Sequence, residues 1–523
     1  MNGLRPARRI PAAALLALTI LVAGCGSSEK KAAGGSGDVL RIPYLADMSV
    51  PDPDVFYDIE GNSVILNQYE GLLRYAPNST KIVGSLADSW TVSPDRLTYT
   101  FKLHPGVTFH DGTPLTSSAV KASFQRRLDV DQAPAYMLKP IKSMATPDPL
   151  TFVVKLKSPV NPFEAYMASS WGPKIIGPEA IKTHAGKDFG QTWLHTHGDG
   201  TGPYKLTGFE RGRQYTLTRN DRYWGPPAAK ANFKTVLIKI TPDIGTQRLE
   251  LQNGDLDAVL KSFPASELAS LPSSLVVQKK PSNLRLLLYV NPNKKPFDDP
   301  AVRAGLRATI DTDQLVSQAY AGTATKSVGA YPEAILPGQP QLPYKVDDAA
   351  AKAAAAKAST KKITLAYTAD ESGVQRRVGE LIQAKLKTAG YDVTLREVQL
   401  PDTYGYVKHL KTAPDLMLQT NTPDAAHPDT WARIVFYSTG GLNFFGYSDK
   451  TVDAELDKAL DAPAAEATQL YQDVGRRVIA SNALFFLGDV KDVFVLNKNL
   501  EGVQSVPEYP WTVSYAPLKR AGS

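Results

Sequence analysis

The stretch Ile363–Val398, ITLAYTADESGVQRRVGELIQAKLKTAGYDVTLREV, decides the fold class. Apolar residues alternate with other residues at both of its ends, which is the period of a strand with a buried face. Between these ends an apolar stripe at helical spacing runs from Val374 to Leu386 and stops before Gly390. A strand, a helix and a strand within this length favour a βαβ unit with parallel strands. We therefore predict an α/β fold, with ligands near the carboxyl ends of the strands.

Further strands and helices are predicted on both sides of this unit. Strict alternation predicts a strand at Leu97–Leu103, and a short apolar run predicts another at Leu416–Leu418. Helices are predicted after Asp299 and Asp311, since both occupy an N-cap position ahead of an apolar stripe. The alanine-rich stretch Asp347–Ala358 is predicted as a solvated helix, with a linker as the alternative.

The N-terminus has the pattern of an export signal. Arginines at positions 5, 8 and 9 precede the apolar run 12–23, AAALLALTILVA, which is short for a membrane span. Small residues then lead into Cys25, the only cysteine. Because this order resembles a lipobox, we expect residues 1–24 to be a signal peptide and Cys25 to become a lipidated N-terminus. The alternative for Cys25 is an ordinary buried thiol.

The residues after the cysteine, GSSEKKAAGGSG, are small and polar and cannot bury a core. We therefore expect residues 25–37 to form a lipidated, flexible tether. One acyl-bearing cysteine without a second apolar segment predicts a protein anchored to the membrane rather than spanning it. The expected location is the outer face of the cytoplasmic membrane.

Composition argues against several classes of function. The formal net charge is +7, of which three positive charges belong to the signal arginines, so the processed chain is only mildly basic. The basic residues are dispersed and lack interleaved aromatic residues, so no nucleic-acid partner is expected. The sequence contains neither a G-x-S-x-G nor an H-E-x-x-H motif, so we do not predict an enzyme. A secreted hydrolase remains the alternative from another class.

Several motifs follow one another in a fixed order. The longest is SPDRLTYTFKLHPGVTFHDGTPLTSSAVKASFQRRLD, at Ser93–Asp129. The shorter ones are QYEGLL at 68–73, GSLADSW at 84–90, GTGPY at 200–204, RLELQNGDLD at 248–257 and PFDDPAVR at 296–303. In order and spacing they resemble the family 5 extracytoplasmic solute-binding proteins. These are the substrate-binding lipoproteins of ABC importers for peptides, nickel and some sugars.

The resemblance implies a two-lobed, periplasmic-binding-protein-like α/β fold of type II, cluster C, with an extra inserted subdomain. Lobe I would comprise residues 38–75, 200–288 and 485–523, with 76–199 as the inserted subdomain, and lobe II would comprise 289–484. The protein would be a monomer without a cofactor and without catalytic activity. It would capture peptides by hinge closure and deliver them to membrane permease subunits.

The resemblance also implies a capture residue. Peptide-binding members of the family carry an aspartate in a W-x-x-D segment after a strand, and this aspartate pairs with the α-amino group of the ligand. Asp424 matches the aspartate, and Asn421 stands at the tryptophan position. An ammonium group removed from water needs a close counter-charge, which explains the aspartate. The alternative is that Asp424 stabilises a turn beside Pro423, and Asn421 leaves the ligand class open.

Aromatic side chains would line the rest of such a pocket, because they offer contact area at little cost in rotamer entropy. By position the candidates are Tyr57, Tyr136 and Trp431, each with core packing as the alternative. A receptor of the same fold for an oligosaccharide or a nickel chelate is the alternative function, and it would not require Asp424.

Two short patterns have the spacing of metal ligands. Asp52 and Asp54 are spaced like the start of a calcium loop, but the rest of that motif is missing. His195 and His197 offer two ligands for a metal such as nickel, although a polar loop is the simpler interpretation. We therefore predict no metal site.

Overall fold

The computed structural model describes residues 38–261, 263–370 and 372–522, which belong to one compact unit. The predicted signal peptide, the tether and Cys25 lie outside these residues. Within them, no helix combines the length and the apolar character needed to cross a membrane. We call residues 285–490 the second lobe and the other described residues the first lobe.

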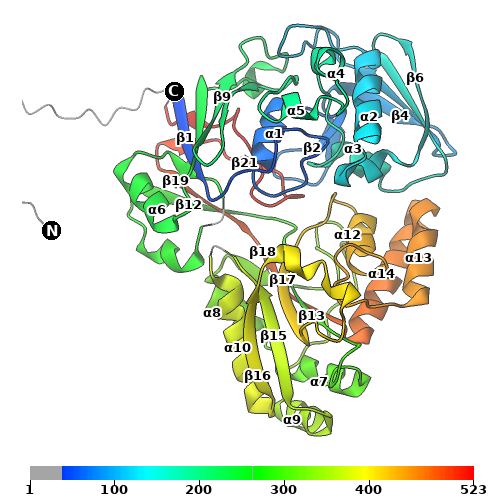
Figure 1. The fold of residues 1–523 in the computed structure, drawn as a ribbon, viewed down its shortest axis with the longest axis vertical. Coiled ribbons are helices and arrows are strands. Elements are labelled where there is room, and N and C mark those ends of the chain that lie inside the picture. The colour runs from blue at the N-terminus through cyan, green and yellow to red at the C-terminus, as the bar shows by residue number, and fades with distance from the viewer. Residues whose placement is uncertain (1–37, 262, 371, 523) are drawn as a thin grey trace, which may run out of the picture. The chain divides into compact units, whose positions relative to one another are not determined.

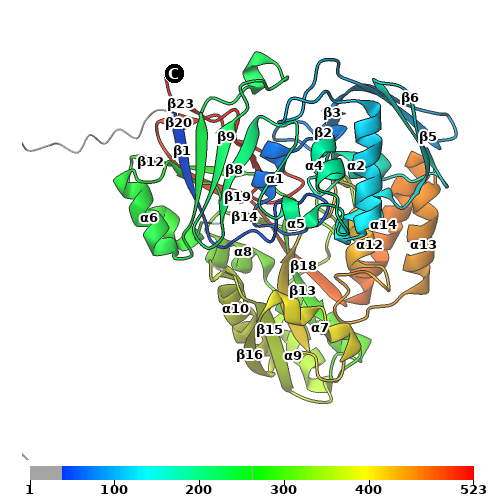
Figure 2. The same ribbon diagram turned by 45° about the horizontal axis from the view of Figure 1, so that its top comes forward.

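Two sheets of the first lobe are built from segments far apart in the chain. Their strands are β1 (Val39–Tyr44), β8 (Tyr204–Glu210), β9 (Gln214–Arg219), β10 (Thr235–Ile240), β11 (Ala258–Val259), β12 (Leu275–Lys280) and β19 (Asp492–Asn497). One sheet has the order β1-β10-β9-β8, with β1 parallel to β10 (Figure 2). The other has the order β11-β19-β12. Strand β19, from the last part of the chain, therefore completes a sheet begun in the middle of the chain.

Shorter elements complete the first lobe outside its inserted segment. They are α1 (Asn62–Gln68), η2 (Pro227–Ala229), α6 (Ile244–Asn253), η3 (Ala265–Ser270), β20 (Leu500–Glu501), β21 (Gln504–Ser505), β22 (Val513–Ser514) and β23 (Lys519–Arg520). Helix α6 ends at Gly254, whose φ of 81° is the left-handed conformation of a helix C-cap.

The segment 76–199, predicted as an inserted subdomain, has a sheet of its own. With the adjoining β2, its elements are β2 (Leu73–Tyr75), β3 (Ile82–Gly84), β4 (Ala87–Val92), β5 (Thr98–Leu103), α2 (Ser117–Val130), η1 (Ala133–Leu138), β6 (Ile141–Asp148), β7 (Thr151–Leu156), α3 (Phe163–Ala168), α4 (Pro178–Thr183) and α5 (Gln191–Leu194). The sheet order is β4-β5-β7-β6. On β5, Tyr99, Phe101 and Leu103 are buried, so the predicted alternation is confirmed.

The second lobe is built on a six-stranded sheet (Figure 1). Its strands are β13 (Arg285–Val290), β14 (Ala324–Lys326), β15 (Lys362–Thr368), β16 (Asp392–Val398), β17 (Leu416–Asn421) and β18 (Leu484–Val490). Its helices are α7 (Pro300–Thr309), α8 (Thr312–Tyr320), α9 (Asp348–Lys357), α10 (Val374–Ala389), α11 (Leu400–Thr403), η4 (Tyr406–Lys408), α12 (Pro428–Val435), α13 (Lys450–Asp461) and α14 (Ala464–Ser481).

The predicted βαβ unit is confirmed, because β15 and β16 pair in parallel and α10 joins them. Strand β17 is parallel to β15 on its other side, and the sheet order is β14-β18-β13-β17-β15-β16. Asp299, Asp311 and Asp347 each accept a hydrogen bond from a backbone N–H two or three residues later. These N-caps confirm the predicted helices, including the alanine-rich one.

Both faces of the central strand β13 are buried. Leu287 and Tyr289 belong to a hydrophobic cluster with α12–α14, whereas Leu286 and Leu288 belong to a cluster with α7–α10. Helices therefore cover both faces of this sheet, which is why β13 carries a continuous apolar run instead of an alternating one.

Within the described residues the chain passes between the lobes twice, at 281–284 and at Lys491. The predicted lobe boundaries, at 288/289 and 484/485, fall inside β13 and β18, and both strands belong to the sheet of the second lobe. The lobe boundaries in the structure lie at the two crossovers instead. The sequence did not place them there, because an apolar run does not reveal which sheet a strand joins.

Candidate functional site

Asp424 lies in the loop after β17, where the second lobe meets the first. Its side chain accepts hydrogen bonds at Oδ2 from the hydroxyl of Tyr57, at 2.7 Å, and of Tyr136, at 2.6 Å. Tyr57 comes from the loop before α1, and Tyr136 comes from η1. Asp424 is only 4 % exposed. Three of the predicted ligand-binding residues, from three distant segments, therefore meet at one carboxylate.

Burial sets the electrostatics of this cluster. Burial raises the pKa of Asp424, and the hydrogen bonds from Tyr136 and Tyr57 oppose that rise. Burial, followed by the charge of Asp424, raises the pKa of both tyrosines well above its ordinary value. The two hydroxyls therefore keep their protons and act as donors to the carboxylate.

The backbone around Asp424 is also held by the first lobe. Ser169 Oγ donates to the carbonyl of Asp424 at 2.6 Å, and the N–H of Ala426 donates to the Tyr75 hydroxyl at 2.8 Å. Ala425 between them is fully buried in the core of the first lobe. The loop is therefore fixed by packing and hydrogen bonds on both sides of the carboxylate.

An aromatic surface surrounds the two tyrosines. The ring of Tyr57 meets Trp171 edge-on, with centroids 4.5 Å apart, and Trp171 meets Tyr509 in the same way at 4.0 Å. Tyr136 packs edge-on against Tyr166 at 5.8 Å. Tyr57 is 40 % exposed, so part of this surface is open to solvent.

The other two predicted residues have different surroundings. Trp431 is fully buried in the core of the second lobe, and its indole N–H donates to the carbonyl of Ala330 at 2.9 Å. This placement corresponds to the core-packing alternative. Asn421 donates to the hydroxyl of Tyr289 at 2.9 Å, across the pair β13–β17. The amide that replaces the family tryptophan is thus held by a neighbouring strand.

Sequence reasoning missed Trp171, Tyr509 and Tyr404. The first two form the aromatic wall behind Tyr57, and Tyr404 is 50 % exposed on the second lobe. Burial and then the charge of Asp424 raise the pKa of Tyr404, which places it in the field of the carboxylate. None of the three lies in a recognised motif, so no sequence signal marks them.

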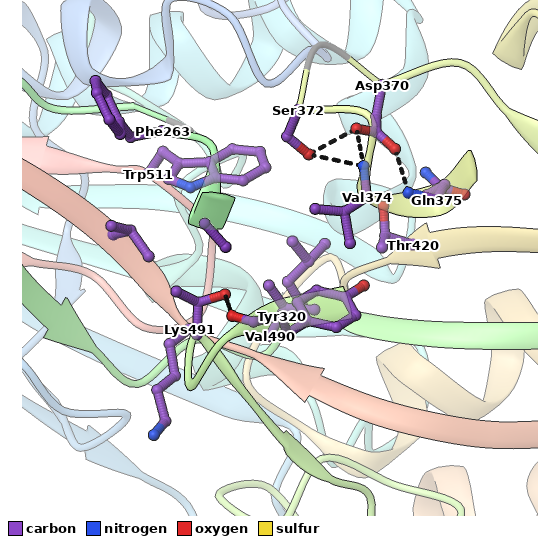
Figure 3. Close-up of a pocket in the computed structure, with 14 residues that line it drawn as sticks. Phe263, Tyr320, Asp370, Ser372, Val374, Gln375, Thr420, Val490, Lys491 and Trp511 are labelled. Carbon is purple, nitrogen blue, oxygen red and sulfur yellow. Dashed lines mark hydrogen bonds between the residues drawn. The ribbon is translucent and has the colours of Figure 1, made fainter. Parts of the chain in front are cut away.

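A small cavity of about 90 Å³ lies between the lobes (Figure 3). Phe263 and Trp511 of the first lobe line it together with Asp370 and Thr420 of the second. The carboxylate of Asp370 caps α10, since it accepts hydrogen bonds from two backbone N–H groups at the start of this helix. Thr420 lies on β17, the strand that leads to Asp424. Pockets for drug-sized ligands usually measure about 300–1,000 Å³, so this cavity is smaller than such pockets.

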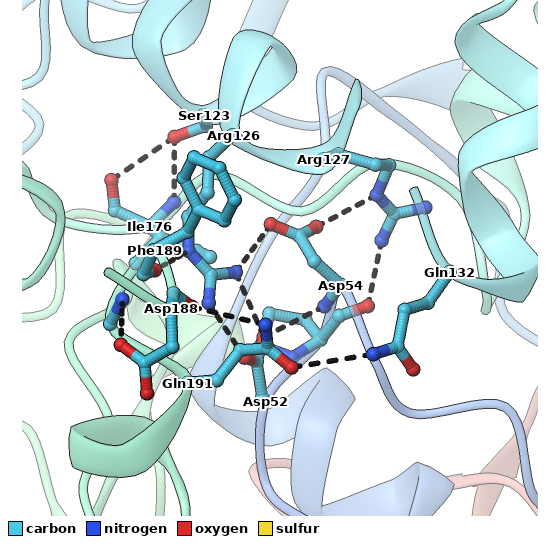
Figure 4. Close-up of polar contacts among 12 residues, drawn as sticks. Asp52, Asp54, Ser123, Arg126, Arg127, Gln132, Ile176, Asp188, Phe189 and Gln191 are labelled. Carbon is cyan, nitrogen blue, oxygen red and sulfur yellow. Dashed lines mark hydrogen bonds and ion pairs between the residues drawn. The ribbon is translucent and has the colours of Figure 1, made fainter. Parts of the chain in front are cut away.

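The loop that leads to Tyr57 is held by a buried ionic network (Figure 4). Arg126 pairs with both Asp52 and Asp54 at 2.6 Å, and Arg127 pairs with Asp54 at 2.8 Å. All four side chains are nearly inaccessible to solvent. The two aspartates thus neutralise the arginines of the FQRR motif and do not form a calcium loop.

Two of the histidines make structural contacts in the first lobe. His110 hydrogen-bonds the carbonyl of Gly202 at 3.0 Å, and burial lowers its pKa to about 4. His197 stacks on Trp193 in a loop. No group of three or more His, Cys, Asp or Glu side chains is placed to hold a metal ion there.

Glycines beside this region are required by close packing. A Cβ atom on Gly200 would lie 2.1 Å from the carbonyl oxygen of Gln68, and one on Gly202 would lie 2.6 Å from that of Asn67. Glycine at these two positions of the GTGPY motif therefore lets the backbone pass close to the end of α1 within the first lobe.

Comparison with known proteins agrees with this architecture. The family model described as "Bacterial extracellular solute-binding proteins, family 5 Middle" matches residues 81–443. A match over this length defines a solute-binding protein that acts outside the cytoplasm, and not an enzyme. The chain belongs to family 5 of the bacterial extracellular solute-binding proteins.

Curated relatives cover nearly the whole chain. The probable D,D-dipeptide-binding periplasmic protein DdpA of Escherichia coli K12 is 29 % identical over 482 residues, which are 89 % of this chain and 91 % of DdpA. The glutathione-binding protein GsiB of Pectobacterium atrosepticum is 28 % identical over 480 residues, with the same coverage of each chain.

Solved structures show the same fold. The periplasmic binding protein DppA of Helicobacter pylori, in complex with the peptide STSA, has a TM-score of 0.77 at 24 % identity and covers 92 % of this chain and 98 % of its own. The substrate-binding protein CtaP of Listeria monocytogenes has a TM-score of 0.82 at 22 % identity and covers 92 % and 99 %. The two-lobed, periplasmic-binding-protein-like fold is therefore confirmed.

Proposed function

We propose that this protein captures short peptides through their free α-amino group and delivers them to the permease of an ABC importer. Asp424 is the proposed counter-charge, and Tyr57 and Tyr136 are the proposed lid that the first lobe places over it. Support comes from relatives whose names specify a dipeptide and glutathione as ligands. The neighbour that holds the peptide STSA has the same fold.

The single observation that carries the proposal is the hydrogen bonding of Asp424. Both tyrosine hydroxyls donate to Oδ2, and no donor from the described residues contacts Oδ1. A carboxylate offers about four acceptor positions, so Oδ1 is left for an ammonium group. Closure then replaces the water around that ammonium by a buried negative charge.

The arrangement also explains how binding is coupled to closure. A ligand shifts the lobes only to the extent that it binds the closed form better than the open form. Tyr57 and Tyr136 reach Asp424 only when the lobes meet, because they and Asp424 belong to different lobes. The proposed ligand is therefore enclosed by Asp424 and the two tyrosines together only in the closed form.

The substitution Asp424→Asn tests the capture role with little change in side-chain volume. Free-amine di- to pentapeptides should bind about 2–5 kcal/mol more weakly, because their ammonium loses its counter-charge. The same peptides with an acetylated N-terminus should bind the variant and the wild type with equal affinity. Isothermal titration calorimetry measures both series.

The control for this experiment is Asp402→Asn, since Asp402 is an exposed carboxylate of the same lobe. It should leave both peptide series unchanged. Equal losses for free and acetylated peptides in Asp424→Asn would remove the amine from the proposal. Saturable binding of an oligosaccharide or a nickel chelate in place of peptides would change the ligand class.

We also propose that the protein is a monomer anchored through a lipid on Cys25 to the outer face of the cytoplasmic membrane. The support is the order of basic, apolar and small residues before this cysteine. Cys25→Ser should move the protein from the membrane fraction to the soluble extracytoplasmic fraction. Retention of the variant in washed membranes would contradict the anchor.

A further inference from the structure

A second, larger cavity lies within the first lobe. Its volume is about 760 Å³, in the range of small-molecule pockets. Apolar and aromatic side chains make up much of its wall, among them Leu66, Leu73, Tyr75, Trp224 and Val506. None of the three residues of the proposed capture site lines it, so it is a separate cavity.

A buried ammonium group lies on the wall of this cavity. Lys174 is 4 % exposed, and its Nζ donates one hydrogen bond, at 2.7 Å, to the carbonyl of Ser169. Among the described residues, no carboxylate lies within ion-pair distance of it and no second acceptor contacts it. The charge of Glu508 acts on Lys174 without forming an ion pair with it. An ammonium group carries three donors, and only one of them has a protein acceptor here, so the cavity wall offers donors to an anion.

The carboxylate on the same wall does not bind these donors. Glu70 accepts hydrogen bonds from Thr201 at 2.7 Å and from Tyr223 and Trp224 at 2.9 Å each, so protein donors occupy it. Arg74 adds a second cation to the wall, and its guanidinium reaches only a backbone carbonyl at 3.4 Å. Two cationic side chains and one carboxylate therefore line the cavity, and the charge of Arg74 acts on that carboxylate.

We propose that this cavity binds a small amphipathic anion, whose apolar body packs against the aromatic and aliphatic wall and whose acid group pairs with Lys174. The chemical class is an anionic acid group, either a carboxylate or a phosphate, on an apolar body. A free acid and the anionic head group of a lipid share this chemistry. The site is additional to the proposed peptide site and does not depend on it.

Titration of the full chain with decanoate tests the proposal, with decanol as the uncharged match of the same length. Decanoate should bind saturably and at least about tenfold more tightly than decanol, since a hydrogen bond to a charged group typically contributes that much. Lys174→Met should weaken decanoate binding by about tenfold or more and leave decanol unchanged. Lys234→Met is the matched control, since Lys234 is an exposed lysine of the same lobe.

The two sources of the anion are separated by titrating decanoate in solution and, in parallel, vesicles of phosphatidylglycerol. Lys174-dependent binding of either one supports the site and names its source. Equal affinity for decanoate and decanol would overturn the proposal. This comparison uses the wild-type chain, so it does not depend on the folding of Lys174→Met. Asp424→Asn should still bind decanoate, and loss of binding there would place the probe in the peptide site and overturn the proposal.

Discussion

The guanidinium of Arg96 donates a hydrogen bond of 2.9 Å to the backbone carbonyl of Ala462, just after α13. Arg96 belongs to the first lobe and Ala462 to the second lobe. Asn161 of the first lobe donates to the carbonyls of Ala459, at 2.6 Å, and of Ala462, at 3.0 Å. The last carbonyls of a helix have no partner within it, so these donors join the two lobes at a point distinct from Asp424.

Removing this contact should weaken ligand binding without touching the ligand. Arg96→Ala and Asn161→Ala each remove hydrogen bonds that exist only when the lobes meet, so the open form gains in population. We expect peptide affinity to fall by about five- to thirtyfold, which corresponds to about 1–2 kcal/mol. Peptide titration measures the affinity, and small-angle X-ray scattering measures the opening.

Arg219→Ala is the control for the lobe contact, because Arg219 pairs with Asp221 inside the first lobe. It should leave both the affinity and the scattering profile unchanged. If Arg96→Ala matched the wild type in both measurements, the contact would have no part in closure.

The hydroxyl of Tyr136 should hold down the pKa of Asp424. This hydrogen bond is the largest effect that opposes the rise caused by burial. Tyr136→Phe should therefore raise the pKa of Asp424, and binding of free-amine peptides should be lost at a higher pH when the solution is acidified. Carboxyl ¹³C chemical shifts, followed through an NMR titration, report the pKa.

Tyr166→Phe provides the comparison, since Tyr166 contacts the ring of Tyr136 but does not hydrogen-bond Asp424. The pKa of Asp424 should then stay at its wild-type value. An equal rise in both variants would mean that packing, and not the hydroxyl of Tyr136, controls the carboxylate.

Asp492 should make stability fall as the pH rises. It is fully buried at the start of β19, next to a crossover between the lobes, and burial raises its pKa to about 8. An aspartate in the unfolded chain has a pKa of about 3.9. Between these values the folded state binds more protons than the unfolded state, so the free energy of unfolding decreases with increasing pH.

Asp492→Asn removes this titration. The melting temperature of the variant relative to the wild type should therefore be higher at pH 8 than at pH 5, as measured by thermal denaturation. Asp221→Asn, an exposed carboxylate, should show the same difference at both pH values. A constant difference for Asp492→Asn would mean that this carboxyl group is already ionised in the folded state at pH 5.

The sequence by itself determined the α/β class, the βαβ unit and the family. Periodicity at Ile363–Val398 reports local geometry, because the strand and helix periods follow from the backbone alone. Aspartates at N-cap positions report helix starts for the same reason, since a cap contacts N–H groups only two or three residues away. The resemblance to the family, through its W-x-x-D segment, was enough to single out Asp424 as a candidate.

Only the tertiary structure decided what surrounds that carboxylate. Tyr57 and Tyr136 lie 367 and 288 residues before it, and nothing in a local pattern states that their hydroxyls meet at Oδ2. Trp431 lies seven residues after Asp424, yet it lies on α12 and packs in the core of the second lobe. Side chains distant in sequence become neighbours only through the packing of the two lobes, and local propensity does not encode that packing.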